Sequence, residues 1–167
     1  MAGLKDFFID QSLNRSFPSN LPGTMEGWET SDRVREVCLA SSVSNAVEIL
    51  PSAPVAIDAS SDEITRVVPC SDEVTTPYGV VIYKTKNFVM KNAGNQKWAT
   101  VARDGAIMNV AVKTTITAGS AVYWDPTDGL YTSSSTNTIK IGMALETIST
   151  AVATGKIVKI EIQSPRV

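Results

Sequence analysis

The fold is decided by residues 104–162, which read DGAIMNVAVKTTITAGSAVYWDPTDGLYTSSSTNTIKIGMALETISTAVATGKIVKIEI. Short runs of β-branched and aromatic residues recur in this stretch, and 107–112 and 121–124 have the length and composition of strands. In the last run, 155–162, three apolar residues alternate with charged ones, at Val158, Ile160 and Ile162. Because a period of two places alternate side chains on one face, this run predicts a strand with one buried side.

Turn residues separate these runs from one another. The dipeptides Asp104-Gly105, Ala118-Gly119 and Asp128-Gly129 each place a glycine where the chain must reverse. Glycine accepts the positive φ that tight turns need, so we predict a turn at each of the three. Strands closed by such turns predict an all-β fold.

The order of these motifs resembles that of a known family. Residues 117–125 (TAGSAVYWD) lead to the Asp128-Gly129 turn, a threonine- and serine-rich stretch, 139–145 (IKIGMAL) and 155–162 (GKIVKIEI). This order is similar to that of the capsid decoration or structural cement proteins of tailed bacteriophages, small β proteins that coat the outside of the head. The resemblance covers the C-terminal part of the chain well and the preceding part only loosely.

The resemblance implies a structural protein of the virion. Such a protein is made in the host cytoplasm, binds the outer face of the capsid and stabilises contacts between major capsid subunits. Its partners are then the major capsid protein and further copies of itself, as a dimer or trimer. The other hypothesis from the sequence is a carbohydrate-binding or host-attachment β module on the virion.

Length and composition fit one globular domain with an arm. The chain has 167 residues, of which 43% are apolar and 19% charged. No apolar run approaches the ~20 residues that cross a bilayer. The net charge is −2 and the basic residues are scattered, which argues against nucleic acid as a partner. The first residues, MAGLKDFFIDQS, do not have the pattern of a secretory signal, so we expect neither a membrane partner nor export.

Residues 1–33 show no sustained helix or strand pattern, unlike the rest of the chain. They therefore predict an extended, mostly irregular N-terminal arm, followed by a β domain over 34–167. Prolines and glycines interrupt any regular period here. The arm nevertheless carries large apolar side chains, which need a surface to cover. The arm either folds back over its own barrel or reaches across a neighbouring subunit. We predict these interface anchors: Phe7, Phe8, Phe17, Leu21 and Trp28.

The middle of the chain predicts further short strands. Residues 34–50 are interrupted by serines and read as two of them. Residues 92–95 (NAGN) predict a hairpin connection, and 132–138 (TSSSTNT) an exposed loop. Altogether we expect nine to eleven strands in one small antiparallel barrel or sandwich, including these runs: 54–59, 64–68, 80–83, 88–90 and 98–102.

Catalytic groups are scarce. The chain has no histidine, which removes Ser-His and Cys-His nucleophile pairs and zinc sites of the Cys/His kind. No phosphate-binding glycine loop occurs either. We therefore expect no enzyme activity, no cofactor and no metal. The only cysteines, Cys38 and Cys70, are predicted to be buried, reduced thiols.

Two features nevertheless remain open to a binding role. Asp125 and Asp128 lie on one turn and could hold a cation, but Asp before Pro and before Gly is ordinary turn chemistry, which we favour. Tyr123 and Trp124 adjoin on a strand and so face opposite sides. One of the two rings should be core, and the other could serve a subunit contact or a sugar.

Overall fold

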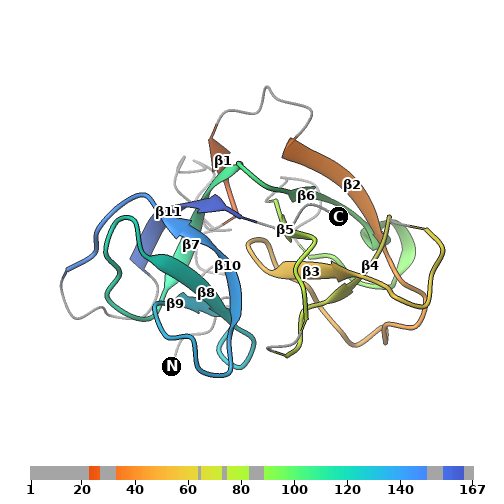
Figure 1. Ribbon diagram of the computed structural model, residues 1–167. Coiled ribbons are helices and arrows are strands. Elements are labelled where there is room, and N and C mark those ends of the chain that lie inside the picture. The colour runs from red at the N-terminus through yellow and green to blue at the C-terminus, as the bar shows by residue number, and fades with distance from the viewer. Residues whose placement is uncertain are drawn as a thin grey trace, which may run out of the picture.

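A computed structural model describes residues 23–26, 33–63, 65–72, 75–82, 89–149 and 156–163. In this part of the chain eleven β-strands form two sheets (Figure 1). The described residues include no helix that is long and apolar enough to span a bilayer. The all-β prediction is confirmed, but the strands build two barrel-like sheets where we expected one.

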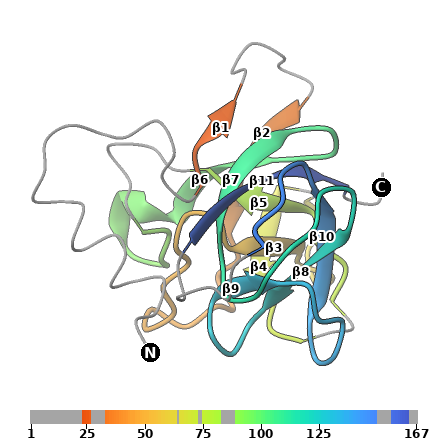
Figure 2. The ribbon, with the colours of Figure 1, turned by 90° about the vertical axis from the view of Figure 1, so that its left-hand side faces the viewer.

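The C-terminal sheet has the strand order β1-β7-β11-β10-β8-β9. A parallel pair, Val112 with Tyr131, joins β7 to β9 and so closes five of these strands into a barrel. Figure 2 shows this sheet facing the viewer. Its strands are β1 (Met25–Glu26), β7 (Ile107–Val112), β8 (Ala121–Asp125), β9 (Leu130–Thr132), β10 (Ile139–Ala144) and β11 (Lys156–Ile162).

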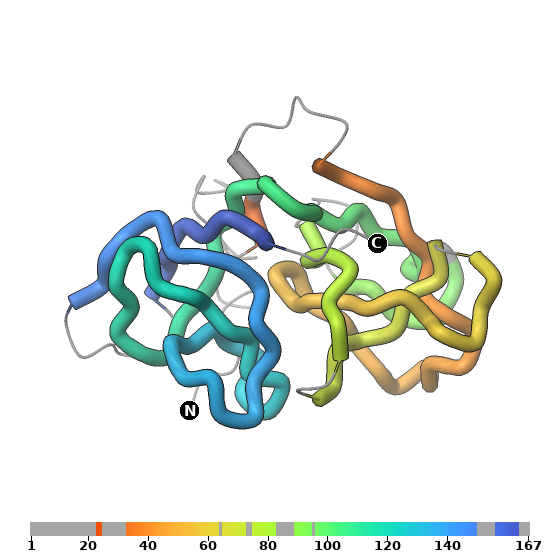
Figure 3. Tube along the Cα trace, in the orientation of Figure 1, coloured from red at the N-terminus to blue at the C-terminus, as the bar shows by residue number. Residues whose placement is uncertain are grey.

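The N-terminal sheet is a closed barrel of order β2-β4-β3-β5-β6. The β2 and β4 strands are parallel, and the other neighbours in it are antiparallel. The two barrels lie side by side in the tube view (Figure 3). Its strands are β2 (Val34–Leu39), β3 (Pro54–Ile57), β4 (Arg66–Pro69), β5 (Gly79–Val81) and β6 (Trp98–Ala102), with the 3-10 helix η2 (Gly94–Lys97) before β6.

The larger hydrophobic core is shared between the barrels. It joins Val80 and Ile82 of the N-terminal half to Val110, Val158 and Ile160 of the C-terminal sheet, all of them buried. A smaller cluster fills the N-terminal barrel with residues that include Val37, Leu39, Val55, Val67 and Val101. Because apolar burial is the main favourable term in folding, a shared core stabilises the two barrels together.

The best-marked sequence predictions are confirmed. The run 107–112 is β7, and 155–162 contains β11, whose Val158, Ile160 and Ile162 are fully buried. The three turn glycines, Gly105, Gly119 and Gly129, have φ values of 76°, 82° and 66°. Local patterns therefore located β7 and β11 of the C-terminal sheet and the three turns correctly.

Other predictions were wrong in detail. Residues 34–50 form one strand, followed by turns and a single bridge between Ile49 and Met90. The Ser44 hydroxyl accepts the Ala46 N–H, a local bond that competes with strand pairing. Residues 92–95 lead into η2 and are not a hairpin connection. The predicted exposed loop 132–138 begins one residue later than expected, because Thr132 is 1% exposed and belongs to β9. The strand β9 itself was not predicted from the sequence.

Candidate functional site at the junction of the two barrels

Residues 23–26, the end of the predicted arm that the structure describes, belong to the C-terminal sheet. The Gly23 N–H donates to the Asn109 carbonyl at 2.7 Å, and the Asn109 N–H donates to the Thr24 carbonyl at 2.9 Å. Asn109 is 2% exposed and its side-chain amide donates to the Thr24 hydroxyl at 2.9 Å. β1 then continues this pairing along β7. These residues therefore fix the point where the preceding segment enters the fold.

Gly23 also packs tightly against the N-terminal half. Its φ is 82°, and a Cβ on it would lie 2.7 Å from Pro51 Cβ and 2.9 Å from the Ser52 nitrogen. Only glycine fits both the backbone conformation and the space. The corner formed by Pro51 and Ser52 is buried, and Ser52 itself has a φ of 69°. The end of the N-terminal segment and the loop at Pro51 and Ser52 thus meet at this corner.

Tyr131 of β9 ties the corner to the C-terminal sheet. Its hydroxyl donates to the Ser52 carbonyl at 2.6 Å, and the Ser52 N–H donates to the Val81 carbonyl at 2.8 Å. Burial raises the pKa of the Tyr131 phenol well above its ordinary value, so it stays a neutral donor. Trp124 contacts the same ring edge to face, with centroids 5.2 Å apart. The junction is therefore held by a directed hydrogen bond as well as by packing.

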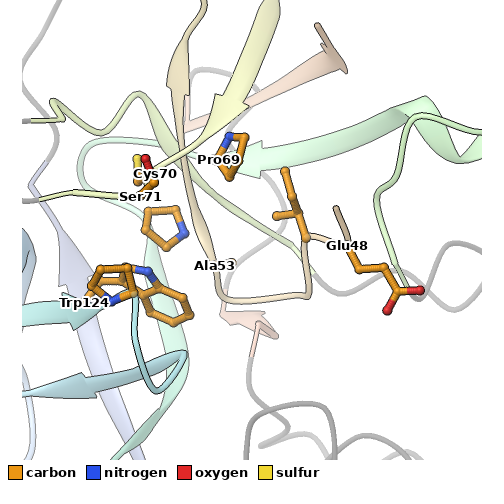
Figure 4. Close-up of a pocket in the computed structure, with 9 residues that line it drawn as sticks. Glu48, Ala53, Pro69, Cys70, Ser71 and Trp124 are labelled. Carbon is orange, nitrogen blue, oxygen red and sulfur yellow. The ribbon is translucent and has the colours of Figure 1, made fainter. Parts of the chain in front are cut away.

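A cavity of about 270 Å³ lies beside this corner, between the barrels. Trp124 and Pro126 contribute the wall from the C-terminal sheet, and the other lining residues come from the N-terminal half. Figure 4 shows Trp124 on one side and the Glu48 carboxylate at the opposite end, with Cys70 and Ser71 on the same side of the cavity as each other. Most of the lining residues are apolar, but polar atoms contribute nearly as much of the cavity surface as apolar ones. The lining residues are Glu48, Ile49, Ala53, Pro54, Pro69, Cys70, Ser71, Trp124 and Pro126.

The cysteines are buried free thiols, as predicted. Burial raises the pKa of Cys70 to about 12, with a smaller contribution from the charge of Asp72. Because the thiolate is the nucleophile, Cys70 is unreactive near neutral pH. Cys38 accepts a hydrogen bond from Arg66 Nη1 at 3.0 Å. Neither thiol is arranged with a neighbouring base for nucleophilic chemistry in the part of the chain that the structure describes.

The turn at 125–129 shows the turn chemistry that we favoured. Asp125 Oδ1 accepts the Thr127 N–H at 2.8 Å, and its other oxygen accepts from the Lys113 ammonium. Lys113 also donates to Asp128 Oδ2 at 2.7 Å. Within the described ranges no three His, Cys, Asp or Glu side chains are grouped to hold a metal ion. The Lys113 ammonium binds both carboxylates and offsets part of their charge, so this turn is a structural feature.

We expect this ion cluster to contribute its full stability between about pH 4 and pH 10, and progressively less at more acidic and more alkaline pH. Burial opposes the charge of Asp125, but its bonds from Lys113 and Thr127 outweigh it and lower its pKa. Burial likewise opposes the charge of Lys113, yet the two aspartates raise its pKa. Because the pKa of Asp125 is lower in the folded protein than in the unfolded chain, its bonds contribute full stability at pH values above the unfolded-state pKa. This contribution is lost as the pH falls through the folded-state pKa. Because the pKa of Lys113 is higher in the folded protein, its bonds contribute full stability below the unfolded-state pKa of lysine. This contribution is lost as the pH rises through the folded-state pKa.

The variant Lys113→Met tests this expectation. It should lower the free energy of unfolding by about 1 kcal/mol at neutral pH, measured by urea denaturation. The deficit should shrink in acid and in strong base, where the native cluster is itself lost. The control is Lys140→Met, which changes an exposed lysine on β10. A deficit that stays constant when the pH passes below the folded-state pKa of Asp125 and above that of Lys113, or an equal effect of the control, would contradict the role of the cluster.

The predicted interface anchors Phe7, Phe8, Phe17, Leu21 and Trp28 lie outside the described residues and stay predictions. The pair on β8 alternates as expected, with Tyr123 half-buried and Trp124 6% exposed. Among the described residues the exposed large apolar side chains are Trp98 and Leu145, which the sequence did not single out.

The junction between the two barrels could not be recognised from the sequence either. Its cavity is lined from three separate stretches, 48–54, 69–71 and 124–126. The sequence feature that could have pointed to the cavity is the group of prolines around the short strands. Prolines mark turns and strand ends, but they do not indicate which distant segments pack against them.

Comparisons with known proteins place the chain in a family. Residues 9–163 match the family described as "Structural cement protein (E217 gp24/Pam3 gp6)". A similar solved structure is the N base of head fiber gp8.5 of bacteriophage phi29, at 16% identity and a TM-score of 0.46, covering 78% of this chain and 92% of that one. No curated protein matches. Because the family match spans most of the sequence, the protein belongs to the structural cement proteins of phages, and it is a structural component of the virion that associates with the capsid.

Proposed function

We propose that this protein binds the outer face of a phage capsid and stabilises contacts between neighbouring major capsid subunits. The observation that carries the proposal is the match of residues 9–163 to the structural cement family. Many copies that each bridge two subunits would oppose separation of the shell, since multivalent attachment adds strength to modest single contacts. The protein acts through the surface that it covers and not through reactive side chains.

The architecture of the described part supports a role as a rigid building block. Each of the strands β2 to β11 has strand partners on both sides, and β1 is the one described strand that pairs on a single side. Closed sheets leave few unpaired backbone groups to join other chains. A dense outer layer of such bodies can therefore form without edge-to-edge aggregation.

The N-terminal arm is the proposed contact with the shell. The described chain begins at Gly23, which is fixed between β7 and the Pro51–Ser52 corner. Residues upstream of this point carry Phe7 and Phe8, large apolar side chains of the kind that dominate interface energies. We propose that these two side chains, together with Trp28, anchor the protein on a neighbouring subunit. The same contacts would join copies of the protein as dimers or trimers.

Binding to heads tests the proposal directly. Purified protein is mixed with expanded heads that lack it, and bound protein is measured after sedimentation as its concentration rises. We expect saturation, with density on the outer face in electron micrographs and a higher temperature of head disruption. Heads that already carry the protein are the control and should take up none. Absence of saturable binding, or binding only to the inner face, would remove the proposal.

A further inference from the structure

We propose that the cavity between the barrels is the seat of the protein's own residues 16–22, SFPSNLP, with Phe17 and Leu21 as the side chains that enter it. The inference concerns the free protein, so it does not rest on capsid binding. It assigns an occupant to a cavity with apolar and polar groups in its lining, whose walls come from both barrels.

The anchored end of the arm lies beside the cavity. Gly23 packs directly on Pro51 and Ser52, while Ile49 and Ala53 of the same loop line the cavity. An extended chain spans up to about 3.5 Å per residue, so Leu21 can lie about 7 Å from Gly23 and Phe17 about 21 Å from it. Both side chains are within reach of the cavity without any change in the described fold.

The size of the cavity suits a phenyl ring. Its volume is about 270 Å³. An apolar cavity of about 150 Å³ already accepts a benzene molecule, so the space here can take an aromatic ring and part of an aliphatic side chain. Filling it would remove apolar surface from water on both the lining and the arm.

The chemistry of the two surfaces also matches. Pro54, Pro69, Pro126 and Trp124 line the cavity, and rigid grooves with aromatic walls bind proline-containing segments well. Residues 16–22 contain two prolines and no charged side chain. Because proline restricts the free chain, the segment loses less conformational entropy when it docks.

Docking would also set the direction of the rest of the arm. With Phe17 and Leu21 held between the barrels, residues 1–15 would leave the fold from a fixed place. Phe7 and Phe8 would then remain free for a neighbouring subunit. The five predicted anchors thus divide into an internal pair and an external set.

Trp124 provides the experiment because its ring lines the cavity. The chain has three tryptophans, so Trp28→Phe with Trp98→Phe leaves Trp124 as the sole tryptophan in the full-length protein, and its emission can be excited selectively at wavelengths where tyrosine does not absorb. In this background Phe17→Ser with Leu21→Ser should red-shift the emission and raise the acrylamide quenching constant about twofold or more, because the ring loses its cover. The matched control, Phe7→Ser with Phe8→Ser, should leave both unchanged. Unchanged quenching in the Phe17/Leu21 variant would overturn the proposal.

A cross-link identifies whose arm is docked. Cys70 lines the cavity, so Phe17→Cys in a Cys38→Ser background should form a disulfide with Cys70 on oxidation at alkaline pH. We expect this bond within one chain, seen as an unshifted monomer on a non-reducing gel and confirmed by peptide mass spectrometry. Phe7→Cys in the same background is the control. A covalent dimer through Phe17→Cys and Cys70 would assign the cavity to a second copy and would contradict docking of the chain's own arm.

Discussion

Gly142→Ala is expected to destabilise the protein by about 3 kcal/mol or more. A Cβ at this position would lie 2.0 Å from the Glu161 carbonyl oxygen and 3.2 Å from Ile162 Cα. Both are backbone atoms of β11, where Gly142 pairs with Ile162, so the contact cannot be relieved by turning a side chain. For a protein of this size the melting temperature should fall by about 6–12 °C, measured by thermal unfolding followed by circular dichroism.

Gly94→Ala separates this steric effect from the general cost of replacing glycine. Gly94 has a φ of 51° and nothing lies within 4 Å of an added Cβ. Its replacement should cost about 1–2 kcal/mol, the penalty for a left-handed backbone, and it should leave the sheets intact. If the two variants melted at the same temperature, the close approach of β10 to β11 would not be a determinant of stability.

The sequence around Gly142 illustrates how far local patterns reach. A glycine inside the run 139–145 indicates a bulge or a close backbone approach, and the pairing of β10 with β8 does shift in register between Lys140 and Gly142. The sequence could not say that β11 lies against it on the other side. Pairing is decided by packing between distant segments, which no short window contains.

The same limit explains the division into two barrels. Strand positions such as 107–112 followed from composition and alternation, whereas the closures depend on parallel pairs that local sequence does not mark. One closure joins β2 to β4 at Cys38 and Arg66, and the other joins β7 to β9 at Val112 and Tyr131. The candidate site at the junction follows from these closures. It could therefore not be predicted before the fold was known.

Removal of residues 1–22 should weaken binding to heads by about 100-fold or more. Large apolar anchors in an interface typically contribute about 2 kcal/mol each, and this deletion removes Phe7 and Phe8. The barrels should still unfold cooperatively, because the deletion ends before Gly23 and leaves the pairing with Asn109 intact. Stability should fall only modestly, by the cover that Phe17 and Leu21 are proposed to give to the cavity. Sedimentation with heads and thermal unfolding measure the two effects separately.

Removal of residues 1–33 provides the contrast, since it also takes away Gly23, Thr24 and β1. Asn109 would then lose its backbone partners at a position that is 2% exposed, and unpaired buried amides cost about 1–3 kcal/mol each. We expect this longer deletion to lower the melting temperature clearly and to promote association through the uncovered edge of β7. If the shorter deletion bound heads as tightly as the full chain, the barrels themselves would be the contact surface. If both deletions melted alike, residues 23–26 would contribute nothing to the C-terminal sheet, against the hydrogen bonds that hold them there.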